Sequence, residues 1–138
     1  MKQDNLMDLY RDDIIRLRRE FHQHPELSFE ETETTRRIAE TLDGWGIPYE
    51  INPAKNTGLV AKISGTQPGK AVALRADIDA LPVEEKTGLP FASDVPGRMH
   101  ACGHDNHISM LLGAARMLMD MRDQIRGDVY LVFQPGEE

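Results

Sequence analysis

The sequence predicts an α/β domain in which helices pack on a mixed sheet. The main observation is that helix-like and strand-like stretches follow one another in the order helix, helix, strand, strand, helix, strand. The chain has 138 residues and is 40% hydrophobic, which is enough to bury one core. No stretch approaches the ~18 apolar residues that a membrane span needs. We therefore expect one globular domain.

The first two elements are expected to be helices. Apolar side chains recur at steps of three and four over residues 5–22, which predicts an amphipathic helix that ends before Pro25. A second helix is expected to begin near Ser28 or Glu30 and to end near Leu42, because two glycines follow closely.

Three short runs predict strands, over residues 58–64, 71–76 and 128–133. The run 71–76 is apolar apart from one arginine, which is typical of a buried strand. A third helix over about 107–124 is expected between the last two strands. Its methionines are interpreted as core-filling side chains rather than as ligands of a soft metal.

Charge and cysteine content exclude several function classes. The net charge of -7 comes from 23 acidic and 16 basic residues, so no basic stripe is present for nucleic acid or an anionic membrane. The single cysteine, Cys102, excludes an internal disulfide, and a reducing cytoplasm is the simplest expectation. Residues 1–13 carry acids and no apolar signal-peptide core.

The segment Met99–His107 concentrates residues that bind metals, because it holds the cysteine, three of the five histidines and an aspartate. In an extended segment, Cys102 and His104 would point to the same side, and Gly103 would let the chain bend around an ion. A lone cysteine is more often a buried, inert residue. The crowding of other ligand types around Cys102 favours the metal interpretation.

Carboxylates follow two of the predicted strands. Asp77 and Asp79 come after the strand 71–76, and Glu137 and Glu138 come after the strand 128–133. Ligands gather beyond the carboxyl ends of strands in such sheets. Adjacent residues on an extended chain point to opposite sides, so one glutamate can coordinate a metal while the other faces a metal-bound water. Asp79 is expected to support the site, and a turn with local side-chain bonds is the alternative.

Several polar residues keep open or structural assignments. His107 is either a ligand or a residue that caps or packs the helix. Asp105 either orients His104 or caps the same helix. His100 is expected either to support the metal ligands or to have a structural role, and the segment His22–Glu26 is interpreted as a structural helix end.

Four segments together resemble the amidohydrolase branch of the zinc aminoacylase/carboxypeptidase family: Arg18–Glu30, Arg75–Pro82, Met99–His107 and Gln134–Glu138. That branch includes hippurate hydrolases, auxin–amino-acid conjugate hydrolases and N-acetyl-diaminopimelate deacetylases. The resemblance covers nearly the whole chain, in order. It implies an aminopeptidase-type catalytic domain of which residues 1–138 are the N-terminal part. It also implies a lid domain, absent from this chain, through which a homodimer can form.

The resemblance also implies the roles of individual residues. Cys102, His104 and Glu138 would be ligands of a centre with two divalent metals, which Zn, Mn, Co or Ni could fill. Glu137 would be the general base and acid, and Asp79 would support the site. The implied reaction is hydrolysis of an amide bond in N-acyl amino acids or small peptides, through a metal-activated water.

Asp77 stands where more distant members of the family carry a ligand histidine, so its role is not transferred. Two other functions compete with the hydrolase. The resemblance implies two further ligand histidines beyond residue 138. Without them, the alternative is a catalytically incomplete fragment that acts at most as a metal-binding or interaction module. A cysteine hydrolase built on Cys102 is disfavoured, because a nucleophile and its base usually come from distant segments.

Overall fold

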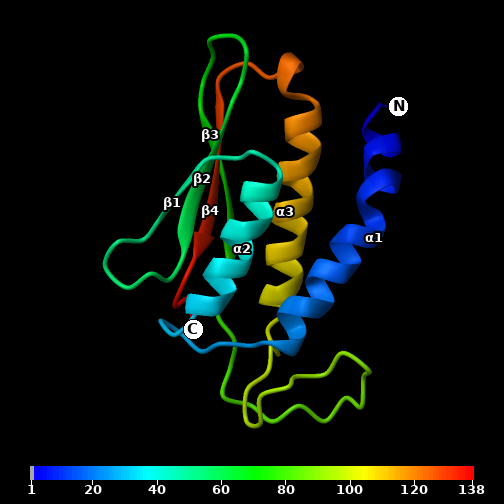
Figure 1. The fold of residues 1–138 in the computed structure, drawn as a ribbon, viewed down its shortest axis with the longest axis vertical. Coiled ribbons are helices and arrows are strands. Elements are labelled where there is room, and N and C mark those ends of the chain that lie inside the picture. The colour runs from blue at the N-terminus through cyan, green and yellow to red at the C-terminus, as the bar shows by residue number, and fades with distance from the viewer. Residues whose placement is uncertain (1) are drawn as a thin grey trace.

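A computed structural model describes residues 2–138, with side-chain burial from residue 5 onward. Three helices pack on a four-stranded sheet (Figure 1). The elements are α1 Lys2–Gln23, α2 Thr32–Gly44, β1 Tyr49–Ile51, β2 Leu59–Ser64, β3 Val72–Asp77, α3 His104–Asp120, the short 3-10 helix η1 Arg122–Gln124 and β4 Asp128–Gln134.

The sheet is mixed, as the sequence predicts. Its strand order is β1-β2-β4-β3, with β1 and β4 antiparallel to β2 and with β3 parallel to β4. The last residues of β3 and β4, Asp77 and Gln134, are register partners. The segments that follow these two strands therefore leave the sheet at the same edge.

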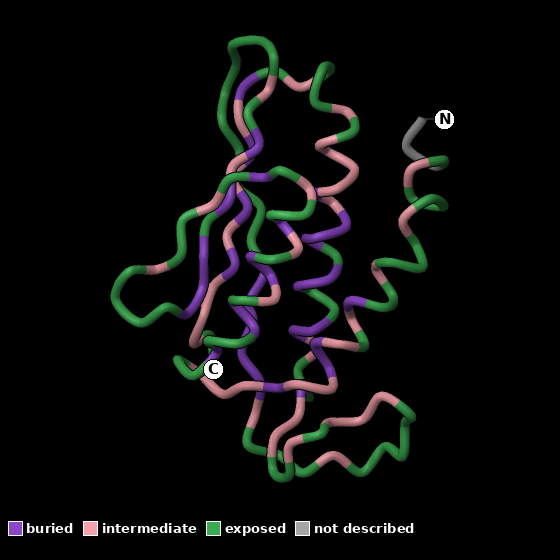
Figure 2. Tube along the Cα trace, viewed as in Figure 1, coloured by how far each residue is buried: buried purple, intermediate pink, exposed green. Residues whose placement is uncertain are grey.

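One face of the sheet and the facing helices form the core, which Figure 2 shows as the purple interior. Residues alternate between buried and more exposed along β2 and β4, the period expected of strands covered on one face. The largest fully buried apolar side chains come from all the layers: Phe21, Ile38, Leu42, Ile47, Ile63, Ile78, Ile108, Leu112, Leu131 and Phe133.

The helices follow the predicted order but differ at their ends. α2 begins at residue 32, because the preceding residues form a bridge between Leu27 and Ala80. α3 begins at His104, because Gly103 adopts φ 80 at the N-cap and its carbonyl accepts hydrogen bonds from the N–H groups of Asn106 and His107. The expectation that Cys102 and His104 share an extended segment is therefore wrong. No helix within residues 2–138 combines the length and apolar character needed to cross a membrane.

Two strand predictions need correction. β1 has only three residues and no clear alternation, so the sequence pattern does not predict it. The prediction that residues 71–76 form a buried strand is wrong for most of β3, since its first four residues are exposed. Val72 is 55% exposed and Leu74 is 39% exposed. β3 is an edge strand, so it has a neighbouring strand on one side only.

Candidate metal centre

The histidine that opens α3 has a defined orientation. Its Nδ1 lies 2.8 Å from the main-chain oxygen of Asp79 and 3.1 Å from that residue's carboxylate. Because a carbonyl oxygen only accepts hydrogen bonds, Nδ1 of His104 is the donor. In the neutral ring, Nε2 of His104 then carries a free lone pair.

This free nitrogen faces carboxylates. Nε2 of His104 lies 3.4 Å from Asp77, 3.7 Å from Glu138 and 3.8 Å from Glu137, measured to the nearest carboxylate oxygen. A lone pair surrounded by acceptors is unfavourable unless a cation lies among them or the ring is protonated. Imidazole and carboxylate groups are also ligands that divalent metals accept. The residues present therefore fit a divalent cation.

Two groups of side chains could hold such an ion, and both contain His104. One consists of Asp79, His104 and Glu137, and the other of Asp77, His104 and His107; within each, the ligand atoms lie within 4.8 Å of one another. The topology explains the convergence, because β3 and β4 end side by side and α3 starts beside them.

Asp79 is buried beside His104 and is itself held by two hydrogen bonds. It is 1% exposed, and its Oδ2 accepts hydrogen bonds from the Ser28 hydroxyl and from the N–H of Glu138, each at 2.8 Å. Burial alone would raise the pKa of Asp79, but the bonds from Glu138 and Ser28 outweigh it and lower the pKa. Asp79 therefore stays ionised while it holds His104.

Cys102 lies at the rim of the site. Its side chain is exposed, and it belongs to neither of the two groups just described. A hydrogen bond to the Glu138 carboxylate raises the pKa of the thiol. Cys102 is thus linked to a residue that faces His104, although it reaches the site from a bend rather than from an extended segment.

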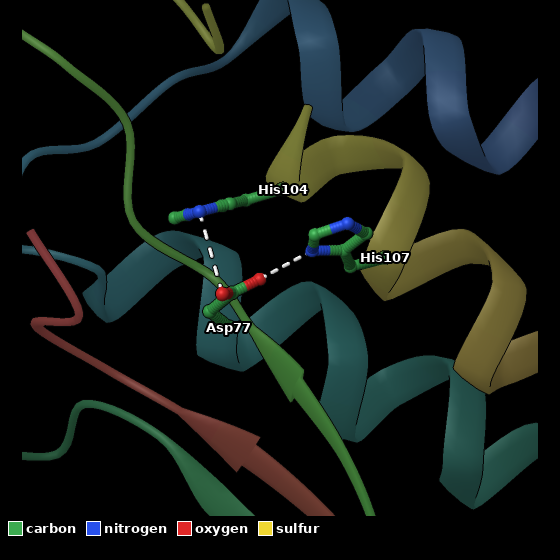
Figure 3. A group of neighbouring side chains, drawn as sticks. All are labelled: Asp77, His104 and His107. Atoms are coloured by element: carbon green, nitrogen blue, oxygen red, sulfur yellow. Dashed lines mark hydrogen bonds and ion pairs between the residues drawn. The ribbon is translucent and has the colours of Figure 1, made fainter. Parts of the chain in front are cut away.

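The pair formed by Asp77 and His107 was left open by the sequence. Nδ1 of His107 lies 2.5 Å from a carboxylate oxygen of Asp77, and the His107 ring stacks on His104 with centroids 5.6 Å apart (Figure 3). The contact forms because Asp77 ends β3 and because His104 and His107 lie three residues apart on one face of α3.

A buried polar network fastens the start of α3 to α1. Oδ2 of Asp105 accepts a hydrogen bond from Nε of Arg18 at 2.9 Å. The buried ring of His22 lies between two carboxylates, 2.8 Å from Asp105 and 2.9 Å from Glu85. The structural assignment of His22 is confirmed. The Asp105 carboxylate bonds Arg18 and His22 rather than the His104 ring, and α3 has no side-chain cap, so both interpretations of Asp105 were wrong.

His100 is a buried histidine next to this network. Its side chain is 4% exposed, and neither ring nitrogen has a hydrogen-bond partner among residues 2–138. Burial lowers its pKa to about 4, against the ordinary value of 6.5. His100 is therefore neutral near pH 7, consistent with a structural role.

Comparison with known proteins shows which proteins this chain resembles. Residues 73–138 match the model of "Peptidase family M20/M25/M40". Thermostable carboxypeptidase 1 of Saccharolobus solfataricus is 54% identical over 125 residues, which cover 91% of this chain and 32% of the relative. Residues 73–138 thus carry part of a peptidase M20 domain. This match and the related carboxypeptidase confirm the resemblance to the aminoacylase/carboxypeptidase family.

Other relatives carry different names. N-acetyl-L-cysteine deacetylase of Bacillus subtilis is 56% identical over 126 residues, which cover 91% of this chain and 30% of the relative. IAA-amino acid hydrolase ILR1-like 5 of Arabidopsis thaliana is 46% identical over 125 residues, which cover 91% of this chain and 28% of the relative. The chain thus spans about a third of the length of the curated relatives it matches.

Solved structures confirm the fold class. The YXEP protein of Bacillus subtilis, described as a dinuclear metal binding peptidase of the M20 family, matches with a TM-score of 0.91 and 46% identity, over 94% of this chain and 36% of that one. A putative aminohydrolase of methicillin-resistant Staphylococcus aureus matches with a TM-score of 0.93 and 44% identity, over 100% of this chain and 37% of that one. Helices on a mixed sheet are thus the architecture shared with M20 proteins.

Proposed function

We propose that residues 1–138 are the N-terminal part of the catalytic domain of a metal-dependent amidohydrolase or carboxypeptidase. Its substrates would be N-acyl amino acids or small peptides. The observation that carries this proposal is the free Nε2 of His104, which faces carboxylates beyond the ends of two parallel strands. The relatives named as a carboxypeptidase, a deacetylase and an amino-acid conjugate hydrolase support the same reaction class.

The proposed ligands are Cys102, His104 and Glu138, and the proposed centre holds two divalent ions such as Zn, Mn, Co or Ni. The description of the YXEP protein as dinuclear supports this number. His104 offers a lone pair, and Glu138 lies 3.7 Å from it. Cys102 would lose its thiol proton on binding, because the thiolate is the ligand form. A cytoplasmic location stays a prediction from the single cysteine, which forms no internal disulfide.

Glu137 is the proposed general base and acid. Its side chain is 37% exposed, and its carboxylate lies 3.8 Å from Nε2 of His104, so it meets both solvent and the site. When bound, the ions supply Lewis acidity that polarises the substrate carbonyl and lowers the pKa of water. Glu137 takes the proton of the attacking water and delivers it to the leaving nitrogen. The products are a carboxylic acid and an amine.

Asp79 has a separate proposed task. Its main-chain oxygen and carboxylate both lie within hydrogen-bond distance of Nδ1 of His104, so they hold the ring in one tautomer. Hydrogen bonds from Ser28 and the Glu138 amide keep the Asp79 carboxylate in place. Asp79 therefore acts through His104 rather than on the substrate.

The first experiment is elemental analysis of purified protein together with its intact mass. About two metals per chain at a mass well above 15.6 kDa would support the hydrolase in a longer protein. Little or no metal at 15.6 kDa would favour the alternative, a fragment that acts at most as a metal-binding or interaction module.

The role of Glu137 is tested by Glu137→Gln in protein that hydrolyses N-acetyl amino acids. We expect turnover to be abolished while the metal content stays unchanged, because the amide cannot accept the proton. The exposed Glu33→Gln, in the first turn of α2, is the matched control. Near-normal turnover of Glu137→Gln would refute the assignment of the general base.

A further inference from the structure

The segment 26–31, part of the connection from α1 to α2, lies against the candidate metal centre. The main-chain N–H of Ala80 donates to the oxygen of Glu26 at 2.8 Å, and Leu27 and Ala80 form a parallel bridge. The segment therefore runs beside the residues that follow β3. It contributes none of the ligands proposed above, yet three of its side chains contact the site.

Glu31 is the most unusual of these three. Its side chain is fully buried, and its Oε2 accepts a hydrogen bond from the N–H of Gly136 at 2.7 Å. Its Oε1 has no partner among residues 2–138, and burial raises the pKa of the carboxyl. Burying a carboxyl with one unpaired oxygen is costly, so its presence requires an explanation.

Ser28 reaches the same turn through Asp79. Its hydroxyl and the N–H of Glu138 donate to one oxygen of Asp79, each at 2.8 Å. The two amides that flank Glu137, those of Gly136 and Glu138, are therefore both bound by buried carboxylates. The main chain at Glu137 is held from both sides.

Phe29 packs against the turn at Pro135–Glu138. It adopts φ 62, a left-handed conformation that is rare for a bulky residue and costs of order 1–3 kcal/mol. Its ring lies against Gly136, where an added Cβ would come within 2.4 Å of a ring atom. Such strain is retained where the surrounding structure needs that conformation.

We propose that Glu31 and Ser28 are positioning residues for the metal centre. They hold the main chain of Pro135–Glu138 so that the carboxylates of Glu137 and Glu138 face Nε2 of His104. Neither residue touches the ion or the substrate. The inference rests on the proposed function only in taking Glu138 as a ligand, whereas the fixed main chain is a separate claim that can be measured without metal.

The test uses the 138-residue chain, two variants of one residue and Co²⁺ as the probe. Glu31→Gln keeps an oxygen that can accept the Gly136 N–H, whereas Glu31→Met has a similar length and no such acceptor. Glu33→Met, at an exposed position nearby, is the control. Co²⁺ affinity is measured by titration, and the hydrogen exchange of the Gly136 and Glu138 amides by NMR.

We expect Glu31→Met to weaken Co²⁺ binding by about 10- to 100-fold, the usual effect of losing a group that orients a ligand. Its Gly136 and Glu138 amides should exchange faster, although the Glu138 amide is bound by Asp79 and not by Glu31. Glu31→Gln and Glu33→Met should stay close to the parent protein. The rescue by glutamine separates positioning from a requirement for charge.

A folded Glu31→Met with parental Co²⁺ affinity and parental exchange at Glu138 would overturn the proposal for Glu31. If Glu31→Met does not fold, Ser28→Ala decides, since it removes one hydroxyl from Asp79. Weaker Co²⁺ binding with faster exchange at Glu138 would then support the proposal, and parental values would refute it. If the parent chain binds no Co²⁺, the proposed metal site fails, while amide exchange still tests the positioning.

Discussion

The two ends of the sheet are built in different ways. At one end, β3 and β4 terminate beside buried ionisable groups, namely Asp77, Asp79 and His104. At the opposite end, between β2, β3 and β4, the chain closes with glycines that are in direct contact with other main-chain atoms. Gly65 donates to the carbonyl of Gly127 at 2.8 Å, and Gly127 donates to the carbonyl of Gln67 at 2.8 Å.

The difference separates stability from function. Close main-chain contacts hold the strands together with few desolvated charges, so the glycine end should dominate folding. Buried charged groups are costly unless something they bind repays the cost. The ionisable end is therefore the part of the sheet where we expect substitutions to change ligand binding more than folding. Four predictions test this contrast, from the largest expected effect to the smallest.

Gly127→Val should have the largest effect on folding. Gly127 adopts φ 82, which a β-branched residue rarely adopts, and an added Cβ would lie 2.2 Å from the carbonyl oxygen of Lys70. We expect the free energy of unfolding in urea to fall by about 4 kcal/mol. Protein that remains folded should keep parental Co²⁺ affinity; a loss of binding in folded protein would break the contrast between the two ends.

Acidification should destabilise the protein through His100. Its pKa is about 4 in the folded state and 6.5 in the unfolded state, so only the unfolded chain gains a proton between these values. The contribution of neutral His100 to the free energy of unfolding is therefore fully present above pH 6.5. It falls as the pH drops towards 4, by about 3 kcal/mol in total.

His100→Phe provides the control for this pH dependence. Neither ring nitrogen has a partner among residues 2–138, so an apolar ring of similar size loses no hydrogen bond there. Melting temperatures measured from pH 7 to pH 4 should fall less steeply in this variant than in the parent. Parallel curves would show that His100 does not carry the effect.

His104→Gln should abolish most metal binding with little effect on folding. The substitution removes the lone pair that faces Asp77, Glu137 and Glu138. We expect Co²⁺ affinity to fall by at least about 100-fold, while the melting temperature changes by a few degrees. His24→Gln, at a half-exposed histidine near the end of α1, should leave affinity unchanged. Equal loss in both variants would indicate nonspecific binding.

Gly88→Ala should have the smallest effect and so sharpens the comparison among glycines. Gly88 adopts φ 70, but an added Cβ meets no atom within 4 Å. Only the backbone conformation is penalised, so we expect a loss of about 1 kcal/mol in urea unfolding. A loss as large as that of Gly127→Val would mean that positive φ, and not the main-chain contact, governs the glycine end.

Most of the fold could be predicted from local patterns. The amphipathic period of α1 and the alternation of β4 each depend on residues close in sequence, and both elements lie where expected. The exposure of β3 could not be predicted in this way. A short apolar run has the same composition at the edge of a sheet as in its middle, and only the strand order places Val72 and Leu74 at the edge.

The candidate site also has features that the sequence shows and contacts that only the structure shows. The ligand types in Met99–His107 and the position of Glu137 after a strand are visible in the sequence. The contact of Asp77 with His107, and the burial of Glu31 against Gly136, join residues 30 and 105 positions apart. No local period reports such contacts, because they form only when the sheet and helices pack.

The sequence by itself determined the fold class, the order of most elements and the chemical types that gather near Cys102 and His104, because these depend on periodicity and composition. Only the tertiary structure decided which nitrogen of His104 is free and which carboxylates face it. That outcome depends on the parallel pairing of β3 with β4 and on the start of α3 at His104. Long-range packing, rather than local preference, sets such distances.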